Sequence, residues 1–148
     1  MAGTRILGLD FGAKTVGVAV TDALMLTAQP LLTIRREREN KLRQTLAKIE
    51  ELCAEYEVER IVLGKPVGLD GAEGDRCEKT GEFKEMLERR LKLPVDYVDE
   101  RFTTAQADRI MELGKVKAKD RKVHSDEMAA SLILQTWLDK TDKNDGKD

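Results

Sequence analysis

Three carboxylates stand at unusual positions in the sequence, and their chemistry sets the first hypothesis. Asp10 closes the apolar run Ile6–Leu9, Glu100 follows a second apolar segment, and Asp126 opens a third. An ionised carboxylate that is partly buried needs a partner. Three carboxylates that converge can meet this need by binding a divalent cation, because hard cations such as Mg²⁺ take oxygen ligands. Beside basic segments, such a site would suit phosphoryl chemistry.

Each of these acids also has an ordinary structural explanation. Asp126 follows Ser125 and could be a first-turn acid on a helix dipole, which is the favoured explanation when it is taken alone. Glu100 is next to Arg101, and a surface ion pair is favoured for that residue in isolation. Asp10 could form an Asx-turn, but an acid that ends so apolar a strand more often belongs to a site. Asp10 is therefore the strongest of the three candidates.

Few other chemistries fit the residues that the chain offers. Cys53 and Cys77 form no C-x-x-C pair, and with His124 as the single histidine a zinc site is nearly excluded. We expect Cys53 in a helix core and Cys77 in a loop or helix start, both reduced. The chain has no G-x-S-x-G and no Walker A lysine pattern. Aromatic residues make up only 4%, which argues against a base-stacking platform.

Charge is unevenly distributed along a chain whose net charge is only −2. Residues 35–48 carry six basic residues against two acidic ones, and residues 115–122 carry five against one. Such segments could hold a phosphate backbone. For 35–48 we favour an ordinary solvated surface, whereas for 115–122 phosphate contact and a solvated loop are equally supported. The Gly-rich loop Gly64–Gly74 could cradle phosphates or serve only as a connector.

Length and hydropathy predict one domain of a cytoplasmic protein. The chain has 148 residues, which suits one domain of about 100–200 residues. We assign the domain to residues 1–138 and expect a disordered polar tail over 139–148. No apolar run is long enough to cross a bilayer, and the N-terminus does not resemble a signal peptide. We therefore expect no membrane partner.

The hydrophobic pattern predicts an α/β fold. Five segments have strand patterns and four have helical ones. The expected strands are Arg5–Asp10, Thr15–Thr21, Gln29–Ile34, Arg60–Leu63 and Val95–Asp99, and the expected helices span about 37–56, 76–92, 103–114 and 126–138. This order predicts a mixed five-stranded sheet, an antiparallel three-strand meander plus two parallel strands, with helices on both faces. The first strand should be central.

Four ordered motifs resemble one known family. They are Gly8-Leu9-Asp10-Phe11-Gly12, then Ile61-Val62-Leu63-Gly64 with Pro66, Asp70 and Gly71, then Asp99-Glu100-Arg101-Phe102-Thr103-Thr104, and finally Asp126 with Ala129-Ala130. Together they resemble the YqgF family of ribonuclease H-like proteins, which are described as nucleases of the 16S rRNA precursor and as Holliday junction resolvases. The resemblance covers about residues 1–138.

The resemblance implies a metal-dependent phosphodiester hydrolase that processes the 5′ end of the 16S rRNA precursor in the bacterial cytoplasm, with a ribosomal particle as a further candidate partner. Its catalytic residues and its ligands for Mg²⁺ or Mn²⁺ would be Asp10, Glu100 and Asp126. Lys65 departs from the family pattern, in which an apolar residue is more frequent. The residues we expect to contact nucleic acid are Lys14, Lys65, Arg101, Lys115, Lys117, Lys119, Arg121 and Lys122.

Three alternative functions stay open. A structure-selective DNA resolvase would use the same metal chemistry, but resolvases generally act as dimers and the sequence favours a monomer. A non-catalytic nucleic-acid-binding adaptor need not keep all three acids, and this chain has them. An actin-like ATPase or sugar kinase closes two related domains around its nucleotide, whereas this chain has room for one.

Overall fold

The strands form one mixed sheet in the order β3-β2-β1-β4-β5. The computed structural model describes residues 5–24, 26–66, 75–99 and 118–145. Its strands are β1 Arg5–Phe11, β2 Thr15–Thr21, β3 Ala28–Arg35, β4 Val58–Lys65 and β5 Val95–Asp99. β2 pairs antiparallel with both β1 and β3, while β4 lies parallel to β1 and β5 lies parallel to β4. The predicted meander, parallel pair and central first strand are confirmed.

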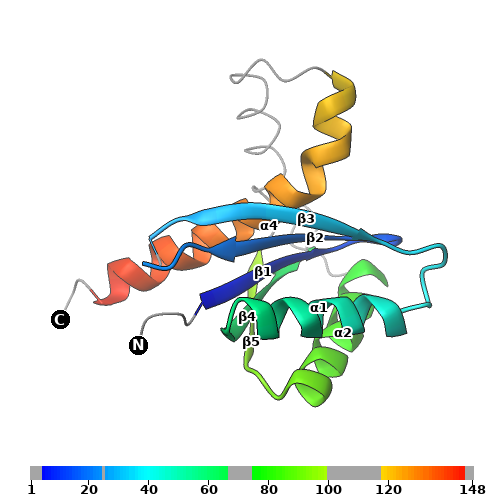
Figure 1. Cartoon of the computed structure of the whole chain (residues 1–148), viewed down its shortest axis with the longest axis horizontal. Helices are drawn as coiled ribbons and strands as arrows, with labels where there is room; N and C mark the ends of the chain where they lie inside the picture. Colours follow the sequence, from blue (N-terminus) through cyan, green and yellow to red (C-terminus); the bar gives the residue numbers. More distant parts are fainter. Residues whose placement is uncertain (1–4, 25, 67–74, 100–117, 146–148) are drawn as a thin grey trace.

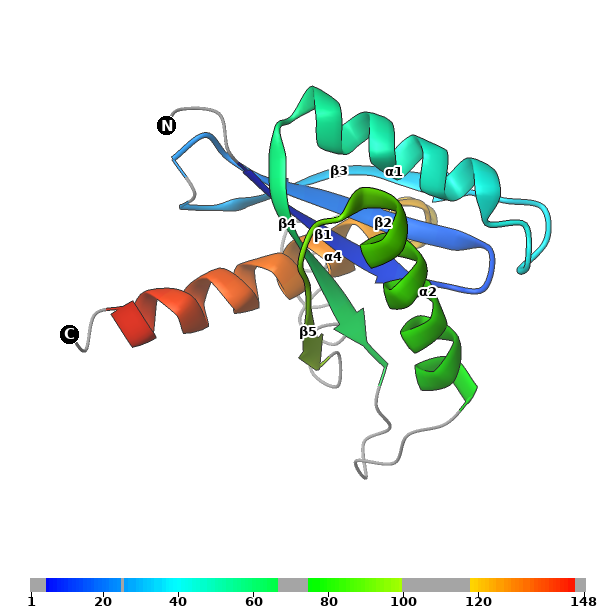
Figure 2. The ribbon, with the colours of Figure 1, turned by 90° about the horizontal axis from the view of Figure 1, so that it is seen from below.

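Three helices cover the two faces of this sheet. α1 (Arg43–Glu55) and α2 (Asp75–Leu91) lie on one face, and α4 (Ala118–Asp145) crosses the other (Figures 1 and 2). The prediction of helices on both faces is therefore confirmed. None of the helices in the described part of the chain has both the length and the apolar character needed to cross a bilayer.

Alternation along the strands produces two separate cores. Toward α1 and α2, side chains such as Leu7, Leu9 and Val18 are fully buried. The aromatic ring of Phe11, the last residue of β1, stacks on Phe83 of α2 with ring centroids 4.1 Å apart. Cys53 is buried in this core, as predicted. Burial of these apolar side chains fixes the register of β1, because a slip of one residue would turn Asp10 into the core.

Small residues bring α4 close to the other face. Gly8 and Ala19 lie opposite each other in β1 and β2, beneath α4. A Cβ at Gly8 would lie only 2.7 Å from the Cβ of Leu134 and 3.0 Å from the carbonyl oxygen of Ala130. Here the absent side chain is what allows the helix backbone to approach the strands. The same residues of β1 therefore bury one face with large side chains and seat a helix on the other.

The ends of two helices differ from the prediction. α1 begins at Arg43 rather than near residue 37, because Arg36 is instead held against the β1–β2 turn. α4 begins at Ala118 rather than at Asp126, so residues 118–123 are helical and not a loop. The predicted helix over 103–114 and most of the loop Gly64–Gly74 lie outside the described residues.

The C-terminal end of α4 corrects a second expectation. The helix continues to Asp145 rather than ending at Leu138, and the disorder expected over 139–148 stays a prediction. Gln135 donates a hydrogen bond to Asp139 one turn later, at 3.1 Å, which links the predicted helix to its extension. The first glycine or proline after Leu138 is Gly146, so the intervening polar residues include no strong helix breaker.

Candidate functional site

Asp10 lies on the α4 face at the end of the central strand. Ile6 and Gly8 face α4, and side chains of alternate residues share a face, so the half-buried Asp10 faces α4 as well. Its direct partner across the β1–β2 ladder is Gly17. Residues opposite each other in an antiparallel pair project to the same side, with Cβ positions about 5 Å apart. The group that packs on Gly17 is therefore a direct neighbour of Asp10.

The space over Gly17 is occupied by the backbone of Asp126. A Cβ at Gly17 would overlap the carbonyl group of Asp126 and would lie 3.1 Å from its Cα. Gly17 thus permits the helix to rest directly on β2, one strand away from Asp10. Two of the three predicted acids, 116 positions apart in the sequence, are brought together by this contact. Asp126 is half-buried there, as Asp10 is.

The same row of the sheet extends to β3. Thr33 is the partner of Gly17 in the β2–β3 ladder, and its hydroxyl lies 3.5 Å from a carboxylate oxygen of Glu127. Asp126 and Glu127 therefore lie over neighbouring strands. The sequence assigned no role to Glu127, because its contact joins segments 94 residues apart and no local pattern announces it.

Arg36 holds the turn that follows Asp10. Its Nη2 donates to the carbonyl oxygens of Gly12 and Ala13, both at 2.7 Å, and its Nε donates to the carbonyl of Glu39 at 3.1 Å. The guanidinium also lies over the Phe11 ring, 5.0 Å from its centroid. The planar fork of arginine suits this bidentate arrangement. The sequence predicts an ordinary solvated surface over 35–48, and only the fold shows that Arg36 positions the turn after Asp10.

The other predicted site residues are not all in one place. Lys14 is exposed in the β1–β2 turn, close to the Asp10 end of the sheet. Lys65 lies over the ring of Tyr97, 5.5 Å from its centroid, on the α2 side and not on the α4 face. The N-terminal part of α4 includes Lys119, Arg121 and Lys122. Glu100, Arg101, Lys115 and Lys117 lie outside the described residues.

The donor set fits a hard divalent cation as far as the described residues reach. Within ranges 5–24, 26–66, 75–99 and 118–145, no group of three His, Cys, Asp or Glu side chains could hold a metal ion. The backbone contact of Asp126 with Gly17 nevertheless brings that residue close to Asp10, and carboxylate oxygens are ligands that Mg²⁺ and Mn²⁺ take. Glu100, the third predicted ligand, would have to complete the set.

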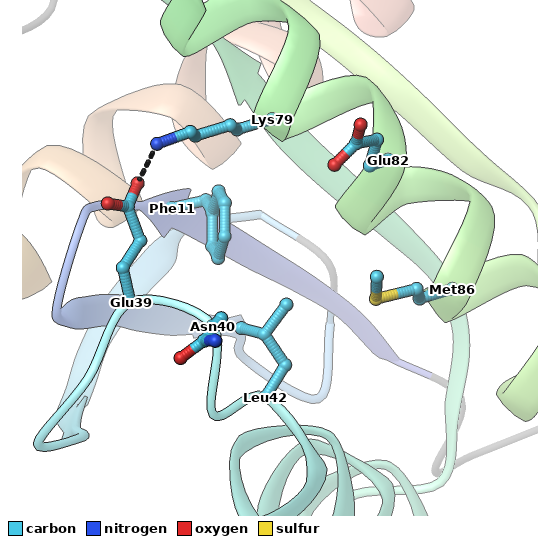
Figure 3. Close-up of a pocket in the computed structure, with 7 residues that line it drawn as sticks. All are labelled: Phe11, Glu39, Asn40, Leu42, Lys79, Glu82 and Met86. Carbon is cyan, nitrogen blue, oxygen red and sulfur yellow. Dashed lines mark hydrogen bonds and ion pairs between the residues drawn. The ribbon is translucent and has the colours of Figure 1, made fainter.

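A separate cavity of about 400 Å³ opens on the opposite face, between α2 and the loop before α1 (Figure 3). Phe11, Leu42 and Met86 contribute apolar walls, while Glu39, Lys79 and Glu82 line its polar part. The ammonium of Lys79 lies 2.8 Å from a carboxylate oxygen of Glu39 and links α2 to the β3–α1 loop. This cavity is on the Phe11 side of β1, so Asp10 faces away from it.

Proteins of similar sequence span nearly the whole chain. A relative from Agathobacter rectalis named "Putative pre-16S rRNA nuclease" is 58% identical over 135 residues, covering 91% of this chain and 94% of that protein. A relative of the same name from Lachnospira eligens is 46% identical over 139 residues, covering 94% of this chain and 99% of that protein.

Solved structures show the same fold at low sequence identity. Thermus thermophilus RuvC in complex with a Holliday junction substrate superposes with a TM-score of 0.58 at 14% identity, over 91% of this chain and 96% of that one. The fowlpox virus Holliday junction resolvase gives a TM-score of 0.54 at 14% identity, over 93% and 98%. The ribonuclease H-like α/β fold is confirmed by these neighbours.

The family assignment follows from the sequence match. The profile of the RuvX family, described as Holliday junction resolvase, matches residues 4–140 and so includes all four motifs identified in the sequence. Together with the relatives at 58% and 46% identity, this match confirms the resemblance to YqgF, and the chain belongs to the RuvX family.

Proposed function

We propose that this chain is a divalent-metal-dependent nuclease that processes the 5′ end of the 16S rRNA precursor. Its family and fold are those of nucleases, which hydrolyse phosphodiester bonds. The name of its relatives supports the RNA substrate. A role on precursor rRNA would place the chain in the bacterial cytoplasm, with a ribosomal particle as a candidate partner.

The contact between Asp126 and Gly17 carries this proposal. Asp10 is opposite Gly17 in the sheet, so the contact supports a site in which Asp126 and Asp10 share one face at the end of the central strand. Two like charges at a half-buried place repel each other unless a cation lies between them. The pairing of two acids across 116 positions supports a built acidic site rather than two unrelated surface acids.

The sequence pattern extends this site to Glu100. Val98 of β5 packs in the core beneath α4, and Glu100 is two residues further along the chain. Since alternate residues of an extended chain share a face, we expect Glu100 to project to the side of Asp10 and Asp126. Parallel strands also bring their carboxyl ends to one edge of the sheet, and β1, β4 and β5 are parallel.

Asp10, Glu100 and Asp126 would together hold Mg²⁺ or Mn²⁺. When bound, such ions activate water and stabilise the leaving oxygen of an in-line displacement. The protein's own contribution is rigidity, because Gly17 seats Asp126 and Arg36 fixes the turn after Asp10. Lys14 and the basic residues 115–122 would contact neighbouring phosphates of the substrate.

Cleavage assays on two substrates test the proposal. An RNA carrying the precursor 5′ end and a four-way DNA junction are each incubated with Mg²⁺ or Mn²⁺. We expect the wild type to cleave the RNA, and Asp10→Asn to be slower by at least about a hundredfold. Asp139→Asn, an exposed acid further along α4, is the matched control and should cleave as the wild type does. Equal activity of Asp10→Asn and the wild type would reject the site.

A DNA resolvase is the second candidate, favoured by the family description and by the RuvC complex. Metal chemistry is the same for both substrates, so the carboxylates do not separate them. Cleavage of the junction without cleavage of the RNA would assign this alternative. Binding of both substrates with cleavage of neither, at any divalent ion, would instead assign a nucleic-acid adaptor.

A further inference from the structure

Five cations gather at the end of the sheet where Asp10 lies. They come from the β1–β2 turn, the end of β3, the loop after it and the first residue of α1, and we call them the β3–α1 basic surface: Lys14, Arg35, Arg38, Lys41 and Arg43. The backbone N–H of Arg36 donates to the carbonyl of Lys14 at 2.9 Å, which ties the turn to the end of β3. Segments apart in the sequence thus form one surface.

The sheet register places part of this surface on the face of the acids. Thr33 faces α4, since it contacts Glu127, and Arg35 is two residues further along β3. Arg35 therefore also faces the α4 side, opposite Thr15. Its Cα is two strands and two residues away from that of Asp10, or roughly 12 Å at the usual strand spacings.

These cations are exposed, and none of them pairs with an acidic side chain in the part of the chain that the structure describes. Among the residues that the structure describes, no ion pair or side-chain hydrogen bond involves any of the five. Some other cations do have acidic partners, as Lys48 has Glu51 and Arg60 has Asp96. Two acids lie near these cations in the sequence. Glu37 is exposed, and Glu39 forms an ion pair with Lys79. Repulsion among neighbouring like charges is relieved by an anionic partner.

The β3–α1 basic surface also contains a groove. A groove of about 680 Å³ runs between the end of β3 and the start of α1, lined by Arg35, Lys41 and Arg43 among others. α1 has no acidic residue in its first turn and no side-chain hydrogen bond at its N-cap, Leu42. The positive end of its helix dipole therefore adds to the field of the three cations. A groove of this kind accommodates a chain of phosphates better than a single ion.

We propose that the β3–α1 basic surface binds the phosphate backbone of the substrate strand beside the acidic site, an inference that rests on the proposed nuclease function. Nucleic acid is the partner because Arg35 shares the face of Asp10 at roughly 12 Å. Along a duplex, where each strand carries one phosphate per about 3.4 Å, that distance corresponds to about three to four nucleotides. These residues bind the flanking strand and do not touch the scissile phosphate.

Binding in EDTA tests the surface without relying on cleavage. We compare Arg35→Gln/Arg43→Gln with Arg89→Gln/Arg90→Gln, which removes the same charge from exposed residues at the end of α2, near the start of β5. Fluorescence anisotropy gives Kd for the precursor RNA and for the four-way junction over a range of salt. We expect the first variant to raise Kd about tenfold and to lower the salt slope by about 1.4 on single-stranded RNA and about 1.8 on the duplex arms of the junction, the values for two phosphate contacts. Arg35→Lys/Arg43→Lys should retain most of the affinity.

The outcomes separate this inference from the proposed function. Unchanged Kd and salt slope in Arg35→Gln/Arg43→Gln would overturn the proposed role of the surface. An equal loss of affinity in the Arg89→Gln/Arg90→Gln control would also overturn it. Polyglutamate that competes as well as RNA of the same charge would assign the surface to an acidic protein and also overturn it. Failure of the wild type to cleave with Mg²⁺ or Mn²⁺ contradicts only the nuclease proposal. With cleavage intact, the first variant should raise KM and leave kcat nearly unchanged.

Discussion

The carbonyl group of Asp126 occupies the space over Gly17 that a side chain would fill. Because Gly17 is the ladder partner of Asp10, one glycine determines how closely a helical acid approaches a strand acid. The geometry of the acidic site therefore depends on a residue that carries no functional group. Substitution at this glycine should affect activity and folding together.

Gly17→Ala tests this dependence. A methyl group there meets main-chain atoms of α4, which cannot rotate away as a side chain could, so the helix must shift. We expect the free energy of unfolding to fall by about 3 kcal/mol, at the upper end for overpacking. Nuclease activity measured below the unfolding temperature should fall more than the folded fraction does. Urea denaturation and cleavage assays give the two quantities.

Gly81→Ala is the matched control for that variant. Gly81 is in α2, and among the described residues a Cβ there would meet only the Tyr97 hydroxyl, at an ordinary 3.7 Å. Alanine in a helix interior is favoured over glycine by about 0.5–1 kcal/mol, so this variant should be more stable than the wild type. If Gly17→Ala proves as stable as Gly81→Ala, the close contact of α4 with β2 is wrong.

Arg36→Ala should loosen the turn next to Asp10. The substitution removes charge-assisted hydrogen bonds to Gly12, Ala13 and Glu39 and the stacking on Phe11. We expect a loss of about 2–4 kcal/mol in the free energy of unfolding, measured in urea. Arg38→Ala, at an exposed neighbour, should change it by no more than about 0.5 kcal/mol. Equal effects of the two substitutions would show that Arg36 is an ordinary surface residue.

Most of the sheet was predictable because its three inner strands, β2, β1 and β4, are buried on both faces. The apolar residues of β1, β2 and β4 leave few alternatives, and the bounds of β2 and β5 match the prediction. Helix ends were less predictable. The start of α1 depends on the contacts of Arg36 with the β1–β2 turn, and these are invisible to a periodicity of 3.6 residues. Similarly, the polar residues after Leu138 suggested that α4 ends there. None of the residues between Leu138 and Gly146 is a glycine or proline, so the helix could continue.

The candidate site also has one residue that the sequence indicated and others that only the fold reveals. Asp10 stood out because an acid at the end of a buried strand conflicts with its local pattern. The proximity of Asp126, by contrast, requires the ladder partner of Asp10 to be a glycine, and pairing register is a property of the whole sheet. The roles of Arg35 and Glu127 also depend on register, since both follow from which residues of β3 face α4.

Divalent cations should stabilise the folded chain through the acidic site. A ligand that binds only the native state raises its stability by RT ln(1 + [L]/Kd), or about 2.7 kcal/mol at a hundredfold excess over Kd. We therefore expect Mg²⁺ or Mn²⁺ to raise Tm of the wild type, and to raise that of Asp10→Asn much less. Asp139→Asn should respond as the wild type does. Equal shifts in all three proteins would mean that the ions act elsewhere.

Cys53 and Cys77 should differ in reactivity by their burial. Desolvation in the core, with a smaller effect of the nearby Glu50 carboxylate, raises the pKa of Cys53 to about 11. Only about one Cys53 side chain in a thousand is then a thiolate at pH 8, and the thiolate is the reactive form. Cys77 is half-buried, and its Sγ lies 3.1 Å from the carbonyl oxygen of Pro66. We expect Cys77 to react first with a disulfide reagent such as DTNB.

We expect the reaction with DTNB to have a fast phase from Cys77 and a slow phase from Cys53, and two single variants test this assignment. Cys77→Ala should lose the fast phase and Cys53→Ala the slow one. Below pH 11 the thiolate fraction of Cys53 rises about tenfold per pH unit. The rate of the Cys77→Ala variant should therefore rise steeply between pH 8 and pH 10, provided that reaction proceeds through the native state. A fast reaction of this variant at pH 8, with circular dichroism unchanged, would show that Cys53 is accessible and that α1 does not cover it.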